Sequence, residues 1–351
     1  MFIPFQAQLM QQKNPTGNKI LFITSGIVIL LIAGVTSLYI SPVPIKFSEI
    51  IKIIFSGPDS ASGNQNALII WQIRIPRLFL AILIGFALSG SGMVMQGLFR
   101  NPLADPFLLG VSAGAALGAT MALHTVISFG LSDTVSIPVF AFLGAFVVTT
   151  IVYILAASRG YINVLKLLLV GISIGSLCSG LTSFLLITGE SGLHRTLFWL
   201  MGSMSSASWS QIWFLLPAVV IGLFLVFYFA RDMDTLLMGE DEASSLGVSV
   251  KQVQIITLFA ATLLASAAVA AGGIIGFVGL VIPHMMRIIF GPKHRLLLIA
   301  SIIAGGILMI IADLIARTIA APAEIPIGII TTFVGVPFFL YLLFRRKTYH
   351  F

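Results

Sequence analysis

The sequence predicts an all-α polytopic membrane protein of about ten transmembrane helices. Hydrophobic residues make up 58% of the 351-residue chain and charged residues only 9%, whereas soluble domains carry roughly 25% charged residues. The apolar residues gather in long runs separated by short polar segments. The net charge of +7 comes from Lys and Arg in those short segments, where they set membrane orientation. We therefore expect the lipid bilayer as a partner and no nucleic acid.

Ten apolar runs approach or exceed the roughly 17–25 residues that a membrane-spanning helix needs. No A-x-A cleavage site follows the first run, so we expect it to be a retained span. Residues 46–55, before the second run, have the pattern of an interfacial amphipathic helix. The predicted spans are 20–40, 74–98, 107–128, 136–157, 164–188, 210–230, 252–271, 274–290, 296–316 and 328–344.

An even number of spans places both termini on one side of the membrane. If that side is the cytoplasm, thirteen of the nineteen Lys and Arg residues face it, as the positive-inside tendency requires. We therefore expect a cytoplasmic N-terminal segment (1–19), a single transmembrane domain (20–345) and a cytoplasmic tail (346–351).

A polar stretch, residues 234–250, lies between two spans and is too short and too polar to cross a bilayer. With Asp232 just before it, it holds five of the twelve acidic residues of the chain. Gly239 and Gly247 divide it as expected of two short helical pieces joined by turns. On the predicted topology it faces the cytoplasm, where a soluble partner could bind it. An ordinary polar loop is the alternative interpretation.

The sequence contains no convincing motif for catalysis or for nucleotide or metal binding. The G-x-S-x-G pattern at 171–175 falls inside a span, whereas a hydrolase needs a strand before the serine and a helix after it. No P-loop, H-E-x-x-H or C-x-x-C occurs, and Cys178 lies in an apolar run as a small hydrophobe. We predict no catalytic residue, bound cofactor or metal site, although haem or metal binding stays open for His124 and His194.

Two further features concern packing and charge. Glycines at 110, 114 and 118, and at 171 and 175, form stripes suited to close helix packing. Asp313 and Arg317 stand at i and i+4 near the end of the ninth span, the favourable order for a helical ion pair. An ionisable residue at membrane depth is a functional candidate.

Several stretches together resemble the FecCD/BtuC family of permeases, the membrane subunits of type II ABC importers for iron-siderophores, haem and vitamin B12. The resemblance covers the chain from about residue 73 to its C-terminus. The matching stretches begin with IRIPRLFLAILIGFALSGSGMVMQGLFRNPLADPFLLGVSAGAALGA at Ile73, LLMGEDEASSLGVSV at Leu236 and GGIIGFVGLVIPHMMRIIFGPKHRLLL at Gly272, followed by ADLIART at Ala312 and EIPIGIITTFVGVPFFLYLL at Glu324.

The resemblance implies a homodimer in a bacterial or archaeal cytoplasmic membrane, around a central path lined from the fifth and tenth spans. Two cytoplasmic ATPase subunits and an external binding protein would complete the importer. The cargo would be a bulky metal chelate, most often an Fe(III)-siderophore in this family, with haem and cobalamin as alternatives. This chain would not be an enzyme, because ATP and Mg²⁺ would bind to the partner ATPases.

The resemblance also assigns residues. Coupling helices that dock on the ATPases would contain Leu236, Leu237, Gly239, Glu240, Asp241, Glu242, Leu246 and Gly247. A cytoplasmic gate would lie at Asn101 and Leu103 and, by a looser alignment, at Val164 and Leu165. Arg74, Arg77 and Arg317 would dock on glutamates of the binding protein; helix-end snorkelling is the other interpretation of these arginines.

The main alternative function is an ion-coupled secondary transporter. Such a protein needs a membrane carboxylate near mid-bilayer, and Asp313 is the candidate. An intramembrane hydrolase built on Ser173 would lack a placed base.

Overall fold

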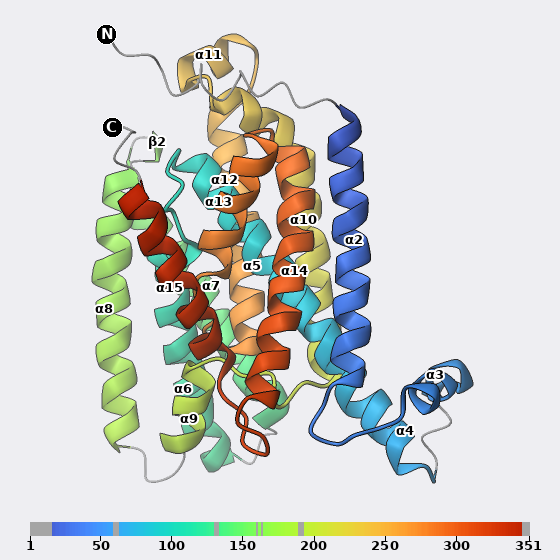
Figure 1. Cartoon of the computed structure of the whole chain (residues 1–351). Helices are drawn as coiled ribbons and strands as arrows, with labels where there is room; N and C mark the ends of the chain where they lie inside the picture. The colour runs from blue at the N-terminus through green and yellow to red at the C-terminus, as the bar shows by residue number, and fades with distance from the viewer. Residues whose placement is uncertain are drawn as a thin grey trace.

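The computed structural model describes residues 16–58, 63–129, 133–158, 161–162, 164–188 and 193–345. They form a bundle of long helices (Figure 1), confirming the predicted all-α membrane fold. The helices matching the ten predicted spans are α2 (Thr16–Tyr39), α5 (Ile75–Leu98), α6 (Val111–Phe129), α7 (Asp133–Ala156), α8 (Val164–Thr188), α10 (Trp209–Leu236), α12 (Val250–Gly272), α13 (Val278–Phe290), α14 (His294–Thr318) and α15 (Ile327–Arg345).

Seven of the described helices are long and apolar enough to cross a membrane by length and composition. The other three, α6, α13 and α15, are apolar but shorter over the residues whose side chains the structure describes. At 1.5 Å per residue, the 13 residues of α13 span only about 20 Å. The non-helical residues 273–277 before α13 complete its predicted span.

The second span begins earlier than predicted. A short helix, α4 (Gln65–Ile69), and a π-helical turn, η2 (Ile70–Arg74), run into α5 without a break, so the helical stretch extends over 34 residues. The Asn64 side chain accepts hydrogen bonds from the backbone N–H groups of Asn66 and Ala67, which caps the start. Pro76 lacks an N–H, and the wider π turn just before it accommodates the missing hydrogen bond.

Helices α5 and α12 form the centre of the bundle. In the most apolar stretch of each helix, 72% of the residues of the helical segment ending in α5 and 78% of those of α12 are buried, against 11% in α2 and 17% in α8. Glycines allow the close contacts at this centre: a Cβ on Gly92 of α5 would lie 1.8 Å from the carbonyl oxygen of Gly279 in α13. Gly114 and Gly118 likewise press α6 against α7, so the predicted packing role of that stripe is confirmed.

The two ends of the bundle carry different small elements (Figure 1). One end carries α11 (Glu240–Ser245), together with the first turn of α2, the last turn of α15 and the hairpin of β1 (Ala157–Ser158) and β2 (Tyr161–Ile162). We call this the α11 end. The opposite end, the α3 end, carries α3 (Phe47–Ser56), α4 and α9 (Leu193–Leu200). The predicted cytoplasmic segments are 1–19 and 346–351. Of these, the structure describes only residues 16–19, which belong to α2.

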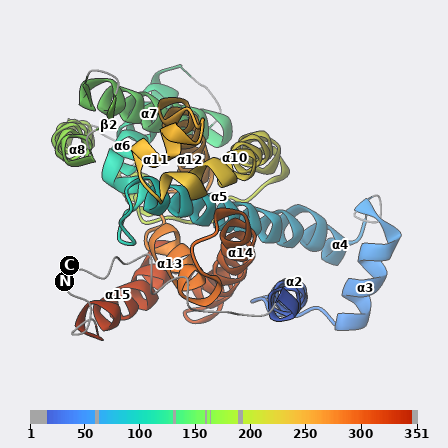
Figure 2. The same ribbon diagram turned by 90° about the horizontal axis from the view of Figure 1, so that it is seen from above.

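Seen from above, α5 crosses the middle of the bundle, and α8 and α2 lie on opposite sides of it (Figure 2). Helix α3 projects beyond α2 and buries Ile50 and Ile53 against α4 and η2. Its other apolar residues, Phe47, Ile51, Ile54 and Phe55, stay exposed. This distribution is the one expected of a helix at a membrane interface.

Candidate functional site

The acidic stretch 234–250 forms the last turn of α10, the separate helix α11 and the first residue of α12. Gly239 has φ = +144° at the N-terminus of α11, so the chain turns sharply between α10 and α11. Glu240, Asp241 and Glu242 occupy the first turn of α11. Carboxylates at a helix N-terminus are favoured by about 0.3–1 kcal/mol each, which explains why this acidic run starts a helix.

Gly247 ends α11 in the left-handed region, with φ = +84°. Its N–H donates to the carbonyl of Ser244 (2.9 Å), and the N–H of Val248 donates to the carbonyl of Ala243 (3.0 Å). These two bonds form a Schellman motif. A Cβ at position 247 would meet nothing within 4 Å, so the requirement for glycine here comes from the backbone conformation and not from lack of space.

Helix α11 presents a mixed surface away from the bundle. Ala243 is fully buried, and the Glu240 carboxylate accepts a hydrogen bond from the Gln254 side chain of α12 at 2.9 Å. Leu246 and Met238 are 65% and 56% exposed. Exposed apolar side chains on either side of three carboxylates along the chain suit a protein partner with a basic groove. Of the other predicted coupling residues, Leu236 is buried, Leu237 is half-buried and Asp241 and Glu242 are exposed.

The predicted gate loop lies at the same end of the bundle, between α5 and the short 3₁₀ helix η3 (Pro106–Leu109). Asn101 is exposed, and its side-chain oxygen accepts from the backbone N–H of Leu103 at 2.9 Å. The loop is therefore an ordered turn that presents a half-buried Leu103. Leu165 on α8 is 66% exposed. The side chain of Val164 lies outside the described residues, and the gate role of all four stays a prediction.

Asp105 starts η3: its carboxylate accepts the N–H of Phe107 at 2.7 Å. Burial of this carboxylate raises the pKa of Asp105 from 3.8 to about 6, although the hydrogen bond from Phe107 acts in the opposite direction. The charged form is thus disfavoured in the folded protein, so stability is lost as the pH rises through about 6.

We expect Asp105→Asn to keep the cap, because asparagine caps as well as aspartate, and to remove this penalty. The difference in thermal midpoint between Asp105→Asn and the wild type should become more positive from pH 5 to pH 8. Asp105→Ala, which also loses the cap, should be less stable than Asp105→Asn by about 1 kcal/mol at every pH. Thermal melts of the purified protein across this pH range measure both effects, and a pH-independent difference for the asparagine variant contradicts the assignment.

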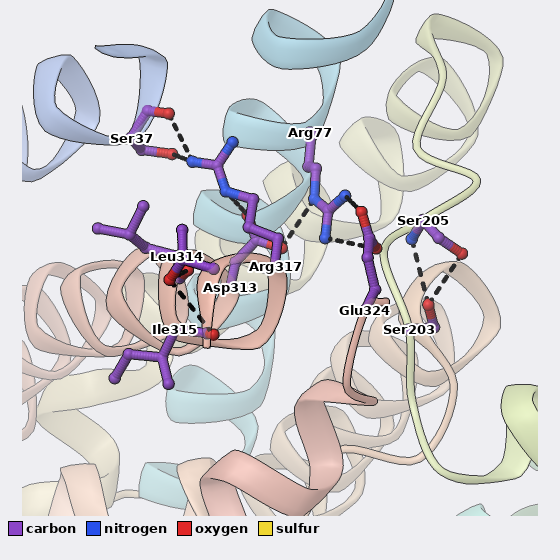
Figure 3. Close-up of polar contacts among 10 residues, drawn as sticks. Ser37, Arg77, Ser203, Ser205, Asp313, Leu314, Ile315, Arg317 and Glu324 are labelled. Atoms are coloured by element: carbon purple, nitrogen blue, oxygen red, sulfur yellow. Dashed lines mark hydrogen bonds and ion pairs between the residues drawn. The ribbon is translucent and has the colours of Figure 1, made fainter. Parts of the chain in front are cut away.

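The α3 end of the bundle contains a network of buried charges (Figure 3). Arg77 of α5 donates through Nε to Asp313 of α14 at 2.8 Å, and its two terminal nitrogens bind both oxygens of Glu324 at 2.8 and 3.1 Å. The second Asp313 oxygen lies 3.6 Å from Arg317 Nε. The predicted Asp313–Arg317 ion pair is therefore confirmed, as one part of a larger network.

Two of the arginines also complete the C-terminus of α2. Arg317 donates to the carbonyl and the hydroxyl of Ser37, and Arg74 donates to the carbonyls of Leu38 and Val43. The last carbonyls of a helix have no partner within it, and cations are favoured at that end. Since two prolines, Pro42 and Pro44, follow α2 and have no N–H to donate, the arginines supply the missing donors.

This network corrects one expectation. Docking on a binding protein requires Arg74, Arg77 and Arg317 to be within its reach, but they are only 3%, 7% and 4% exposed. Their guanidinium groups have partners within the chain, so they are not free charges at the rim in this structure. Glu324, whose side chain is 36% exposed, is the network member that a soluble partner could reach. Sequence reasoning missed it because Arg77 lies 247 positions away.

The remaining candidate residues are a serine, a cysteine and two histidines, and no catalytic or metal-binding arrangement includes them among the described residues. Ser173 lies within α8, and its hydroxyl donates to the carbonyl of Leu169, as serines in helices commonly do. Cys178 is buried. His124 is exposed near the end of α6, and the side chains of His194 and Arg195 lie outside the described residues.

Comparison with known proteins identifies the family. The FecCD transport family matches residues 29–345. The hemin transport system permease protein HmuU of Yersinia pestis is 41% identical over 82% of this chain and 87% of its own length. The cobalamin import system permease protein BtuC of Halobacterium salinarum is 40% identical over 84% of this chain and 76% of its own length.

A third relative, the Fe(3+) dicitrate transport system permease protein FecD of Escherichia coli, is 35% identical over 93% of this chain and 98% of its own length. A solved structure described as an inward-facing conformation of a metal-chelate type ABC transporter superposes with a TM-score of 0.78. It is 31% identical and covers 92% of this chain and 98% of its own. The chain therefore belongs to the FecCD transport family.

Proposed function

We propose that the chain is the membrane permease subunit of an ABC importer and passes a bulky metal chelate to the cytoplasm. ATP hydrolysis on two separate ATPase subunits would drive transport, and an external binding protein would deliver the cargo. The observation that carries this proposal is α11, a capped acidic helix with exposed apolar side chains that projects from the bundle. Relatives at 35–41% identity are named for hemin, cobalamin and ferric dicitrate. We propose an Fe(III)-siderophore first, with haem and cobalamin as alternatives.

The exposed faces of the long helices support a dimer around a central path. The exposed face of α10 carries large apolar side chains that suit lipid: Trp213, Phe214, Val220, Ile221, Phe224 and Phe227. The exposed face of α8 differs, because serines and a glycine interrupt its apolar residues: Ser173, Ser176, Ser179, Gly180 and Ser183. Serines and glycine favour contact with another helix or with a water-filled path. We therefore propose that α8 faces the second copy of this chain.

An ion-coupled secondary transporter is the less supported function. Its coupling carboxylate would be Asp313, which is 1% exposed and already binds Arg77 and Arg317. A carboxylate whose two oxygens already bind two arginines has no free oxygen to bind a coupling ion.

Docking of the binding protein on Arg74, Arg77 and Arg317 stays a prediction. Since these arginines are buried, it now requires that they leave their present partners, and Glu324 would be the first group that a docking protein meets.

Assembly with the ATPases tests the proposal. The chain, expressed with an ABC ATPase encoded beside it, should co-purify with it as two copies of each. Leu246→Asp, which adds a charge to the exposed apolar part of α11, should abolish that association. Ser56→Asp adds the same charge to an exposed site at the α3 end and should leave it unchanged. Equal retention of the ATPase by both variants contradicts docking at α11.

Topology is predicted with the α11 end in the cytoplasm. The single native cysteine, Cys178, is buried, so background labelling should be low. A membrane-impermeant maleimide added to sealed cells should label Ser56→Cys and leave Glu240→Cys unlabelled until the cells are opened. The reverse pattern contradicts the orientation.

A further inference from the structure

The base of the coupling segment meets the N-terminus of α14 through one pair of side chains, a half-buried carboxylate and a buried imidazole. Asp234 lies in the last turn of α10, directly before α11. One of its carboxylate oxygens accepts both the backbone N–H of His294 (2.8 Å) and a contact from His294 Nδ1 (2.7 Å). His294 is the first residue of α14 and is fully buried. The pair therefore joins the end of α10 to the start of α14.

The imidazole of His294 also contacts α5. A Cβ added to Gly97 would lie 2.4 Å from His294 Nε2 and 3.1 Å from the Met233 methyl group. No side chain fits at position 97, so the ring packs directly on the α5 backbone. Arg287 of α13 is close enough to interact electrostatically with both Asp234 and His294. Four helices thus converge on this pair.

A second contact ties α5 to the same place. Arg100 follows α5 with φ = +47°, a strained value for a non-glycine residue. Its side chain donates to the carbonyl of Leu236, the last residue of α10, at 2.6 Å. That carbonyl belongs to the helix-terminal group that has no partner within α10. Since Arg100 directly precedes Asn101, this bond connects the coupling segment to the predicted gate loop.

We propose that Asp234, His294 and Arg100 are positioning residues that make the coupling segment move as one body with α5 and α14. The inference rests on the proposed function, in which α11 docks on an ATPase. Helix α11 has six residues, of which only Ala243 is buried, and among the described residues one side-chain hydrogen bond, Gln254 to Glu240, joins it to α12. A displacement of α11 therefore reaches the gate loop through the contacts at its base. Without them α11 would move and the bundle would lag behind.

The test uses the complete transporter, with its ATPases and binding protein, reconstituted in vesicles. Two readouts are taken: cargo moved per ATP hydrolysed, and the distance between spin labels at Ser245→Cys and Lys293→Cys in a Cys178→Ser background. Both label sites are exposed. In the otherwise unmodified protein, the label distance should be the same without nucleotide and with ATP trapped on the ATPases.

Asp234→Ala removes the acceptor. It should lower cargo moved per ATP by about fivefold or more, the range of a typical coupling free energy, and make the label distance change when ATP binds. Asp234→Asn keeps an acceptor oxygen and should restore most of the ratio. Asp232→Ala, two residues earlier, is the matched control: its carboxylate makes no hydrogen bond or ion pair to another helix among the described residues, and it should behave as the wild type.

Two results overturn the inference. One is a wild-type ratio and an ATP-independent label distance for Asp234→Ala. The other is equal loss in Asp234→Ala and Asp234→Asn together with loss of ATPase binding, which indicates a role in folding only. If the unmodified complex itself shows no ATP-driven uptake, the proposed function fails and the inference falls with it. A working wild type with an unaffected Asp234→Ala refutes the inference alone.

Discussion

Asp313→Asn is expected to destabilise the protein by about 3–5 kcal/mol, the typical effect of removing one partner from a buried ion pair. Asp313 is 1% exposed and lies between Arg77 and Arg317, which are also buried. The amide has the same shape as the carboxylate, so the loss comes from the charge. Two guanidinium groups would then share Glu324 as their remaining carboxylate in the described network. A clear fall in the thermal midpoint of the purified protein measures this effect.

Two further variants separate the charge from its position. Glu324→Gln should have a much smaller effect, because the Glu324 side chain is 36% exposed and water screens its interaction. The double variant Asp313→Asn/Arg317→Met should be less destabilised than the sum of the two single changes, since it removes an unpaired buried cation. Additive effects, or a wild-type midpoint for Asp313→Asn, would contradict a stabilising role for the network.

Gly247→Val is expected to uncouple ATP hydrolysis from transport while the protein still inserts in the membrane. The left-handed conformation of Gly247 costs an ordinary L-residue roughly 1–2 kcal/mol, and a β-branched residue is a genuine outlier there. The Schellman motif at the end of α11 should therefore open and change the angle at which α11 meets its partner. The measurement is cargo moved per ATP hydrolysed by the reconstituted complex.

Its controls separate backbone conformation from side-chain bulk. Gly247→Asn should keep most of the coupling, because asparagine tolerates the left-handed region. Ser245→Val places the same bulk two residues earlier, at an exposed helical position, and should also stay coupled. If Gly247→Val transports with a normal ratio, or if Ser245→Val is equally impaired, the cap does not determine coupling.

The ten membrane helices could be predicted because a span needs about 20 apolar residues and the chain marks each one with short polar segments. The range 164–188 predicted for the fifth span coincides with α8, and the range 20–40 differs from α2 by a few residues. The second span was predicted too short. Asn64, Gln65 and Asn66 look like a loop by composition, but Asn64 caps a helix that continues through the π turn into α5.

The candidate sites also differ in whether the sequence alone could predict them. The caps of α11 depend on residues within a few positions of one another, so Gly247 could be identified from its neighbours alone. The ionic network could not, because Arg77 meets Asp313 across 236 positions and Glu324 across 247. No local pattern records which helix ends pack together. The arginines at the α3 end thus resembled exposed rim charges in sequence, although tertiary packing buries them.

The measurement that tests the central claim most directly is uptake into vesicles that contain this chain with its ATPases and receive the loaded binding protein from outside. The cargo would be a radiolabelled ferric hydroxamate, with hemin and cobalamin as parallel arms. The account predicts uptake of one of these chelates that requires ATP inside the vesicles and does not respond to a proton or sodium gradient alone. Uptake driven by such a gradient without ATP would contradict it.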